Sequence, residues 1–142
     1  MYKFSKRSIQ NLNTCHKDLR TLFNEVIKYY DCTIVCGHRN KEDQDKAYAE
    51  EKSQVRWPDS KHNKYPSMAV DVAPYELNGI DWGKTQTSYF AGFVKGVHAL
   101  LYDQGIITHR LRMGIDWDSD NDINDTKFWD PCHFELISNK II

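Results

Sequence analysis

Two short segments in which polar and apolar side chains alternate place the strongest constraint on how this chain can fold. Strand periodicity puts alternate residues of 67–73 and 132–137 on opposite faces of a sheet. One face carries the apolar residues Met68, Val70 and Val72 in the first segment and Cys132, Phe134 and Leu136 in the second. The other face carries Asp71 and His133. Both segments are therefore predicted to be strands that cover a core on one side and present polar groups on the other.

The remaining elements follow from apolar periodicity and from turn signals. Helical spacing predicts a helix over 17–30 and a second long helix over 87–104, and Asn40 with Asp43 indicates the start of a shorter helix that runs to about 51. Further strands are expected over 32–37 and 111–115, and the polar segment 52–66 is expected to be a long loop. This order predicts an α+β fold, a small mainly antiparallel sheet with flanking helices, as a single domain over 1–142.

Charge and hydropathy exclude several classes of protein. The 142 residues carry 19 basic and 20 acidic side chains, for a net charge of -1, so the chain has no polybasic signature of nucleic-acid binding. It has no apolar run of membrane-spanning length and no segment typical of a signal peptide. We therefore expect no nucleic-acid partner and no membrane insertion, and we expect the chain to reside in the cytoplasm.

Residues suited to hold zinc lie in three short motifs. His62, Asp71 and His133 offer two imidazoles and a carboxylate, a set that leaves one zinc position open for water. Zinc lowers the pKa of bound water to about 7, and a carboxylate that is not a ligand, here Asp130, can move the proton. A chain with six histidines could contain such a trio by chance, so composition alone leaves a zinc site and ordinary histidines both open.

The motifs around these residues resemble one peptidase family. Ser60-Lys61-His62, Ala69-Val70-Asp71 and Asp130-Pro131-Cys132-His133-Phe134-Glu135-Leu136 look like the S-x-H, A-x-D and D-x-x-H-F-E-L motifs of the zinc D-alanyl-D-alanine carboxypeptidase family. Within it, the chain is most similar to the phage L-alanyl-D-glutamate endopeptidases that act as endolysins. Further similar motifs are Phe4 to Ser8, Gly37-His38-Arg39 with Gln44, Asp81-Trp82, and Met113 to Trp117, so the resemblance reaches about residue 137.

The resemblance implies roles for individual residues and a fold of the hedgehog and D-Ala-D-Ala peptidase type. It makes His62, Asp71 and His133 the ligands of one Zn²⁺ per chain and Asp130 the general base. Arg39 would stabilise the oxyanion or orient the substrate, with a helix-start salt bridge as the alternative. Ser60 and Gln44 would contact the substrate, with capping or packing as the alternative. The gap of eight residues between His62 and Asp71 is longer than in some relatives, which affects only the expected loop shape.

The function implied by the resemblance is hydrolysis of the L-alanyl-D-glutamate bond in the stem peptide of bacterial peptidoglycan, leading to host lysis. Such an enzyme is expected to be a monomer that accumulates in the host cytoplasm and reaches the wall through a separate membrane pore. Two alternatives stay open at this point. One is a D-alanyl-D-alanine carboxypeptidase or dipeptidase of the same family, and the other is a cell-wall peptide binder without catalysis.

Three further features carry weaker predictions. Asp116, Asp118, Asp120 and Asp122 alternate as in a calcium loop, but Asn121 and Lys127 depart from the EF-hand pattern, so Ca²⁺ and a solvated loop are both open. Cys15, Cys32, Cys36 and Cys132 are too scattered for a disulfide framework, and buried small hydrophobes are expected, with a role as a metal ligand left open for Cys132 because it adjoins His133. Five aromatic residues are expected to line a substrate groove or to serve as core and rim side chains: Trp57, Tyr65, Trp82, Trp117 and Trp129.

Overall fold

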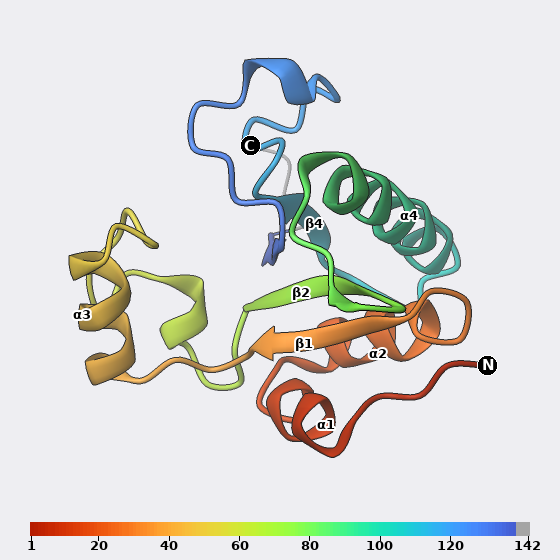
Figure 1. The fold of residues 1–142 in the computed structure, drawn as a ribbon, viewed down its shortest axis with the longest axis horizontal. Helices are drawn as coiled ribbons and strands as arrows, with labels where there is room; N and C mark the ends of the chain where they lie inside the picture. Colours follow the sequence, from red (N-terminus) through yellow and green to blue (C-terminus); the bar gives the residue numbers. More distant parts are fainter. Residues whose placement is uncertain (139–142) are drawn as a thin grey trace.

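The computed structural model of the chain describes residues 1–138, which form a mixed sheet-and-helix domain (Figure 1). The α-helices are α1 (Lys6–Leu12), α2 (Lys17–Val26), α3 (Lys41–Ala49) and α4 (Lys84–Asp103). The strands are β1 (Cys32–Cys36), β2 (Ala69–Glu76), β3 (Gly79–Ile80), β4 (Arg110–Met113) and β5 (His133–Ile137), and two 3₁₀ helices are η1 (Lys61–Asn63) and η2 (Ile123–Asp125). No helix among these residues is long and apolar enough to cross a membrane.

The sheet has the order β1-β2-β5-β4, with β3 paired to β2, and every pairing between these strands is antiparallel. The predicted α+β class with a mainly antiparallel sheet is therefore confirmed. The central strands are β2 and β5, the two alternating segments of the sequence. Their apolar faces are buried as predicted, because Val70, Val72, Phe134 and Leu136 all belong to the core.

Helices α2 and α4 supply the rest of that core. Leu19, Leu22 and Phe23 of α2 are fully buried, as are Phe90 and Val94 of α4. The Phe23 and Phe134 rings meet edge to face with centroids 5.4 Å apart, which joins α2 to the sheet. By contrast, α3 lies to one side, beyond the end of β1, together with the 52–66 loop (Figure 1).

Two helix boundaries and one whole helix differ from the sequence-based expectation. Helix α2 ends at Val26 rather than near Tyr30, because Lys28 and Tyr29 bond to carbonyls three residues back and tighten the last turn. Helix α4 begins at Lys84 rather than Thr87. Helix α1 was not predicted, although Ser5 is a recognisable N-cap whose hydroxyl accepts from the Ser8 N–H.

Candidate metal centre

Asp71 and His133 are brought together by the pairing of the two central strands. They stand directly opposite each other in the β2–β5 register, so their side chains leave the sheet on the same face. His133 Nδ1 lies 3.3 Å from Asp71 Oδ1. The prediction that both residues project from the face opposite the core is therefore confirmed, and their separation is that of two ligands of one ion.

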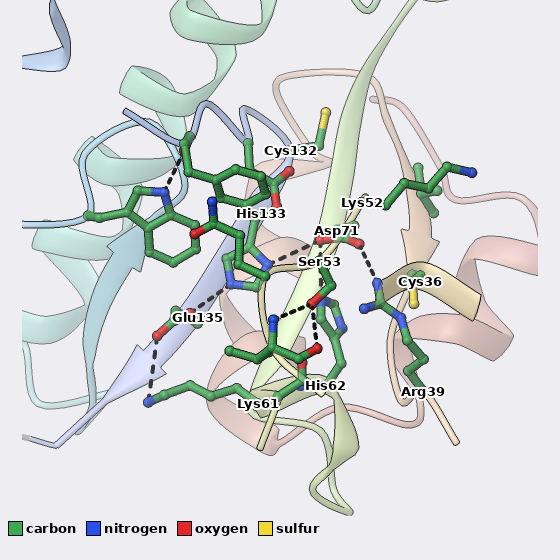
Figure 2. A pocket seen from close by; sticks show the side chains of 18 of the residues that line it. Cys36, Arg39, Lys52, Ser53, Lys61, His62, Asp71, Cys132, His133 and Glu135 are labelled. Atoms are coloured by element: carbon green, nitrogen blue, oxygen red, sulfur yellow. Dashed lines mark hydrogen bonds and ion pairs between the residues drawn. The ribbon is translucent and has the colours of Figure 1, made fainter. Parts of the chain in front are cut away.

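His62 reaches the same carboxylate from η1. The Ser60 hydroxyl accepts from the His62 N–H, and the Asn63 side chain accepts from the Ser60 N–H, which forms a capping box around this short turn. His62 Nε2 then lies 3.2 Å from Asp71 Oδ1. The two imidazoles therefore converge on one carboxylate oxygen, and residues from three separate elements meet at one point (Figure 2).

Each imidazole is held by its other ring nitrogen. His62 Nδ1 donates to the Gly37 carbonyl at 2.8 Å, and His133 Nε2 donates to Glu135 Oε1 at 2.8 Å. A carbonyl cannot donate, so neutral His62 keeps its proton on Nδ1 and turns the Nε2 lone pair toward Asp71. Metal-ligating histidines in proteins are oriented in this way by a carbonyl or a carboxylate. The donor set and its orientation therefore fit a zinc ion.

The electrostatics of the three groups favour a cation between them. Burial alone would lower the pKa of His62, but the Asp71 carboxylate outweighs burial and raises that pKa to about 10. The pKa of His133 is also raised, by its bonds to Asp71 and Glu135 against the opposing effect of burial. Burial would raise the pKa of Asp71, but the two imidazoles hold it well below its usual range. Positive charge is thus stabilised at this point, whether protons or a metal ion supply it.

Asp130 lines the same pocket, on the segment that leads into β5. Its backbone N–H donates to the Gly114 carbonyl at 2.9 Å, and the Gly114 N–H donates to the His133 carbonyl at 2.9 Å. A Cβ on Gly114 would overlap the Asp130 carbonyl oxygen, so glycine permits this close approach. Burial, and next the charge of Asp71, raise the pKa of Asp130. A raised pKa suits a carboxylate that takes up and returns a proton near neutral pH.

Arg39 lies on the other side of Asp71. Its Nη2 is 3.4 Å from Asp71 Oδ2, and its Nη1 donates to Gln44 Oε1 at 3.0 Å. Gln44 is fully buried and also receives a bond from Asn63, while Ser60 is 6% exposed and caps η1. The structure therefore gives Gln44 and Ser60 positioning roles, and their contacts with substrate stay predictions.

The pocket around these residues has a volume of about 760 Å³. Trp82, Trp117 and Trp129 line it as expected, whereas Trp57 and Tyr65 are not among its lining residues. Tyr65 is 73% exposed and instead meets the His38 ring, so the groove prediction is wrong for this residue. Basic side chains also line the pocket, namely Arg39, Lys52, Lys61 and Arg112. Acidic side chains line it as well, among them Glu51, Asp59 and Glu135, so the pocket has aromatic walls and a lining of mixed charge.

The acidic loop between β4 and β5 is closed mainly by hydrogen bonds of its own. Asp116 is buried and accepts from the N–H groups of Asp120 and Asn121. Oxygens of Asp116, Asp118 and Asp120 lie within 4.8 Å of one another, whereas Asp122 caps η2 by accepting from the Asn124 N–H. Three of the four aspartates predicted to bind calcium are therefore grouped, and the calcium hypothesis stays a prediction.

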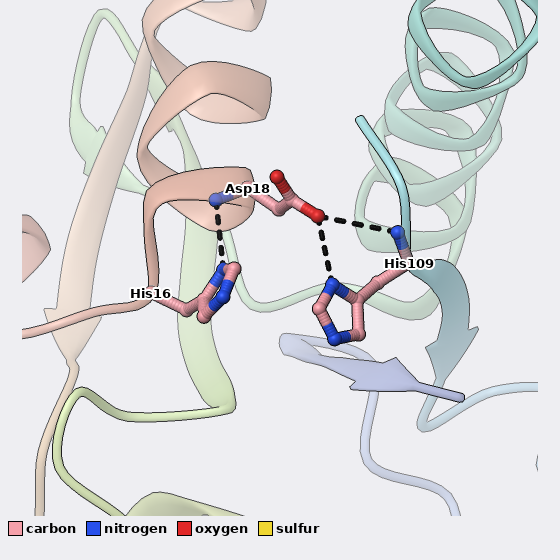
Figure 3. A group of neighbouring side chains, drawn as sticks. All are labelled: His16, Asp18 and His109. Atoms are coloured by element: carbon pink, nitrogen blue, oxygen red, sulfur yellow. Dashed lines mark hydrogen bonds and ion pairs between the residues drawn. The ribbon is translucent and has the colours of Figure 1, made fainter. Parts of the chain in front are cut away.

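A second histidine cluster, around His16 and His109, was not predicted from the sequence. The Asp18 carboxylate is 2% exposed and accepts from the His109 ring at 2.8 Å and from the N–H groups of Thr108 and His109 (Figure 3). The His16 ring accepts from the Asp18 N–H and caps α2. The cluster ties the start of α2 to the segment before β4, across 90 residues of sequence that no local pattern connects.

The convergence of His62, Asp71 and His133 beside a pocket is the arrangement expected of a metallopeptidase. The profile of the family described as phage L-alanyl-D-glutamate peptidase matches residues 1–137, and the chain belongs to that family. It is therefore an L-alanyl-D-glutamate peptidase, which confirms the enzyme class and the family inferred from the motifs.

Solved structures show the same fold. The crystal structure of the Serratia marcescens L-Ala D-Glu endopeptidase ChiX superposes with a TM-score of 0.70 at 21% identity, covering 95% of this chain and 90% of that one. The LD-carboxypeptidase LdcB gives a TM-score of 0.54 at 21% identity, covering 87% of this chain and 57% of that one. Comparison with curated protein sequences gives no match.

Proposed function

We propose that this chain is a zinc-dependent endopeptidase that cuts the stem peptide of bacterial peptidoglycan between L-alanine and D-glutamate, as one catalytic domain and as a monomer. The observation that carries the zinc assignment is the convergence of His62 Nε2 and His133 Nδ1 on Asp71 Oδ1, at 3.2 and 3.3 Å. The family gives the bond that is cut. His62, Asp71 and His133 would hold one ion per chain.

A bound zinc ion would supply a Lewis acid for the scissile carbonyl and would lower the pKa of water to about 7. Asp130 takes the proton that the attacking water loses and returns it to the departing D-glutamate amine. Its raised pKa lets it hold that proton between the two transfers. A half-buried carboxylate that lines the same pocket as the ligands can do this without leaving the pocket.

Arg39 has two tasks in this proposal. It lies 3.4 Å from Asp71 Oδ2 and so limits how that carboxylate can rotate. Its guanidinium lines the pocket and can donate to the oxygen on which negative charge develops. Of the other basic residues that line the pocket, Lys61 and Arg112 are paired with Glu135, so Lys52 is the one that we propose to meet a carboxylate of the stem peptide.

Mass spectrometry of muropeptides, after digestion of purified peptidoglycan with and without a chelator, tests the proposal. New C-terminal L-alanine that disappears with the chelator and returns with added zinc is expected. Release of free D-alanine would instead identify the carboxypeptidase alternative. Wall binding without any new peptide ends would identify a binder that does not cleave.

Asp130→Asn tests the proton carrier. The rate is expected to fall by about 10²- to 10⁴-fold, the usual contribution of general acid–base catalysis, while zinc affinity stays close to that of the wild type. Asp103→Asn, at the exposed end of α4, serves as the matched control. Wall digestion by Asp130→Asn at the wild-type rate would remove Asp130 from the mechanism.

We propose that the chain is made in the host cytoplasm and reaches the wall through a separate membrane pore, which its phage family supports. Expression alone should then leave host cells intact, and a membrane-permeabilising agent should trigger lysis. Lysis on expression alone, with no pore present, would contradict this route.

We also propose that the acidic loop takes up calcium, supported by the grouping of Asp116, Asp118 and Asp120 oxygens. Such an ion would order the segment that leads into Asp130. Added Ca²⁺ should then raise the melting temperature of the wild type but not of Asp118→Asn. A melting temperature that does not respond to Ca²⁺ in the wild type would refute the idea.

A further inference from the structure

A fourth candidate donor, besides His62, Asp71 and His133, lies in the same row across the sheet as Asp71 and His133. Cys36 of β1 is opposite Asp71 of β2, and Asp71 is opposite His133 of β5. Directly opposed residues of antiparallel strands project from the same face, with Cβ atoms about 4.5–5.5 Å apart. The sheet therefore presents a row of Cys36, Asp71 and His133, with Asp71 in the middle and His62 reaching it from η1.

An irregularity in β1 is what puts the cysteine in this row. Ile34 is opposite Val72, and the register then shifts so that Cys36, rather than Val35, is opposite Asp71. Two residues of β1 thus face one residue of β2, as in a β-bulge. Bulges are over-represented beside active sites, where they re-aim a side chain. Without the shift, Val35 would take the place opposite Asp71.

The distances suit a shared ion. Cys36 Sγ, a ring nitrogen of His62 and a carboxylate oxygen of Asp71 all lie within 4.8 Å of one another. Donors of a tetrahedral zinc site, at about 2.0–2.3 Å from the metal, lie about 3.5 Å apart, so small side-chain rotations bring this group to bonding distance. Figure 2 shows the Cys36 sulfur near the Arg39 guanidinium and the Asp71 carboxylate, whereas the Cys132 sulfur points away from the histidines.

The solvent exposure of Cys36 is also consistent with a role as a metal donor. The four cysteines of the sequence all lie in the described part of the chain, and among them Cys36 is the one that is not buried. Its sulfur makes a weak contact of 3.6 Å with the Gly37 carbonyl, and the residue lines the pocket together with His62 and Asp71. The expectation of a buried small hydrophobe is therefore wrong for Cys36, which is accessible from the site.

We propose that Cys36 donates its sulfur to the metal in the resting site, an inference that rests on the proposed zinc centre. The thiol would release its proton to solvent as the sulfur–metal bond forms. With His62, Asp71 and His133 this makes four protein donors, the closed arrangement of structural zinc sites. The sulfur must then leave before water can occupy its position. A thiolate also shifts metal preference toward soft ions such as Cd²⁺.

Cobalt substitution of the full-length protein tests the proposal without using activity. Metal-free wild type loaded with one equivalent of Co²⁺ is expected to show a near-ultraviolet sulfur-to-cobalt charge-transfer band. Cys36→Ser should lose this band while still binding one equivalent of Co²⁺. Cys132→Ser, which removes the neighbouring thiol that points away from the site, should keep it.

The outcomes separate this inference from the proposed function. Stoichiometric Co²⁺ binding by the wild type without the band would overturn the sulfur ligand and leave the zinc centre standing. Failure to bind any divalent metal would overturn both. If Cys36→Ser does not fold, cadmium NMR of the wild type decides, because a sulfur ligand moves the resonance far downfield and a site of nitrogen and oxygen donors alone does not.

Discussion

Removal of the Glu135 carboxylate is expected to weaken metal binding without removing a ligand. Glu135 Oε1 accepts a hydrogen bond from His133 Nε2 at 2.8 Å, and the residue Glu135 is 5% exposed. Burial alone would raise its pKa, but the bonds from His133 and Arg112 hold it at about 2, so the carboxylate is charged at neutral pH. It therefore fixes the His133 ring and makes Nδ1 more basic.

The expected loss of zinc affinity depends on how much of the interaction between Glu135 and His133 each substitution removes. Loss of a partner that orients a ligating histidine costs about 10- to 100-fold in metal affinity, or about 1.4–2.7 kcal/mol. Glu135→Gln keeps an acceptor oxygen and loses only the charge, so the lower end is expected. Glu135→Ala also leaves Arg112 and Lys61 without their carboxylate, at 2.7 and 3.7 Å, so the upper end is expected.

Competition with a chromophoric zinc chelator at neutral pH gives the dissociation constants. Glu76→Gln, an exposed position at the far end of β2, is the matched control and should bind zinc like the wild type. Urea unfolding of the metal-free proteins separates affinity from stability. Zinc dissociation constants of Glu135→Gln and Glu135→Ala within twofold of the wild type would refute the role given to Glu135.

Two further substitutions test residues that hold the fold or the site in place but are not among the proposed metal ligands. Asp18→Asn should lower the free energy of unfolding at pH 7 by about 1–3 kcal/mol, because a buried acceptor of several bonds loses its charge. Burial would raise the pKa of Asp18, but the His109 and Thr108 bonds lower it, so this stabilisation is complete above about pH 4 and is lost as pH falls through the lowered pKa. A difference between the urea midpoints of the wild type and Asp18→Asn that is as large at pH 2.5 as at pH 7 would contradict this. Gly114→Ala places a Cβ 2.9 Å from Asp130 Cβ and so should displace Asp130. Wall digestion should fall by about 10²-fold, because a displacement of about 1 Å at a catalytic group can cost that much. Full activity with an unchanged melting temperature would argue against this role of Gly114.

The polar face of the sheet could be predicted because it follows from period-two alternation. Asp71 and His133 each lie between apolar neighbours on a strand. Because those neighbours must face the core, the two polar side chains project from the opposite face of the sheet. The pairing of the two strands, which puts these residues opposite each other, could not be predicted from the alternation within each strand. Register depends on contacts between segments some 60 residues apart, and the sequence alone held no turn that would set it.

Cys36 and the His16–Asp18–His109 cluster could not be predicted for the same reason. The irregular register of β1 changes which side chain stands beside Asp71, and a local strand pattern assumes regular alternation. Asp18 looks like an ordinary residue in the first turn of a helix, and its partners lie 90 residues away. Both features arise from tertiary contacts that no short motif records.

The strand order has a consequence for synthesis on the ribosome. Strand β5 is the last described strand to be made, yet it lies between β2 and β4 and carries His133. A nascent chain that lacks residues 133–137 leaves β4 without a partner strand, gives β2 an open edge beside its pairing with β1, and has a core without Phe134. Neither the core nor the candidate metal centre can be completed until this strand leaves the ribosome, so the fold and the site form together.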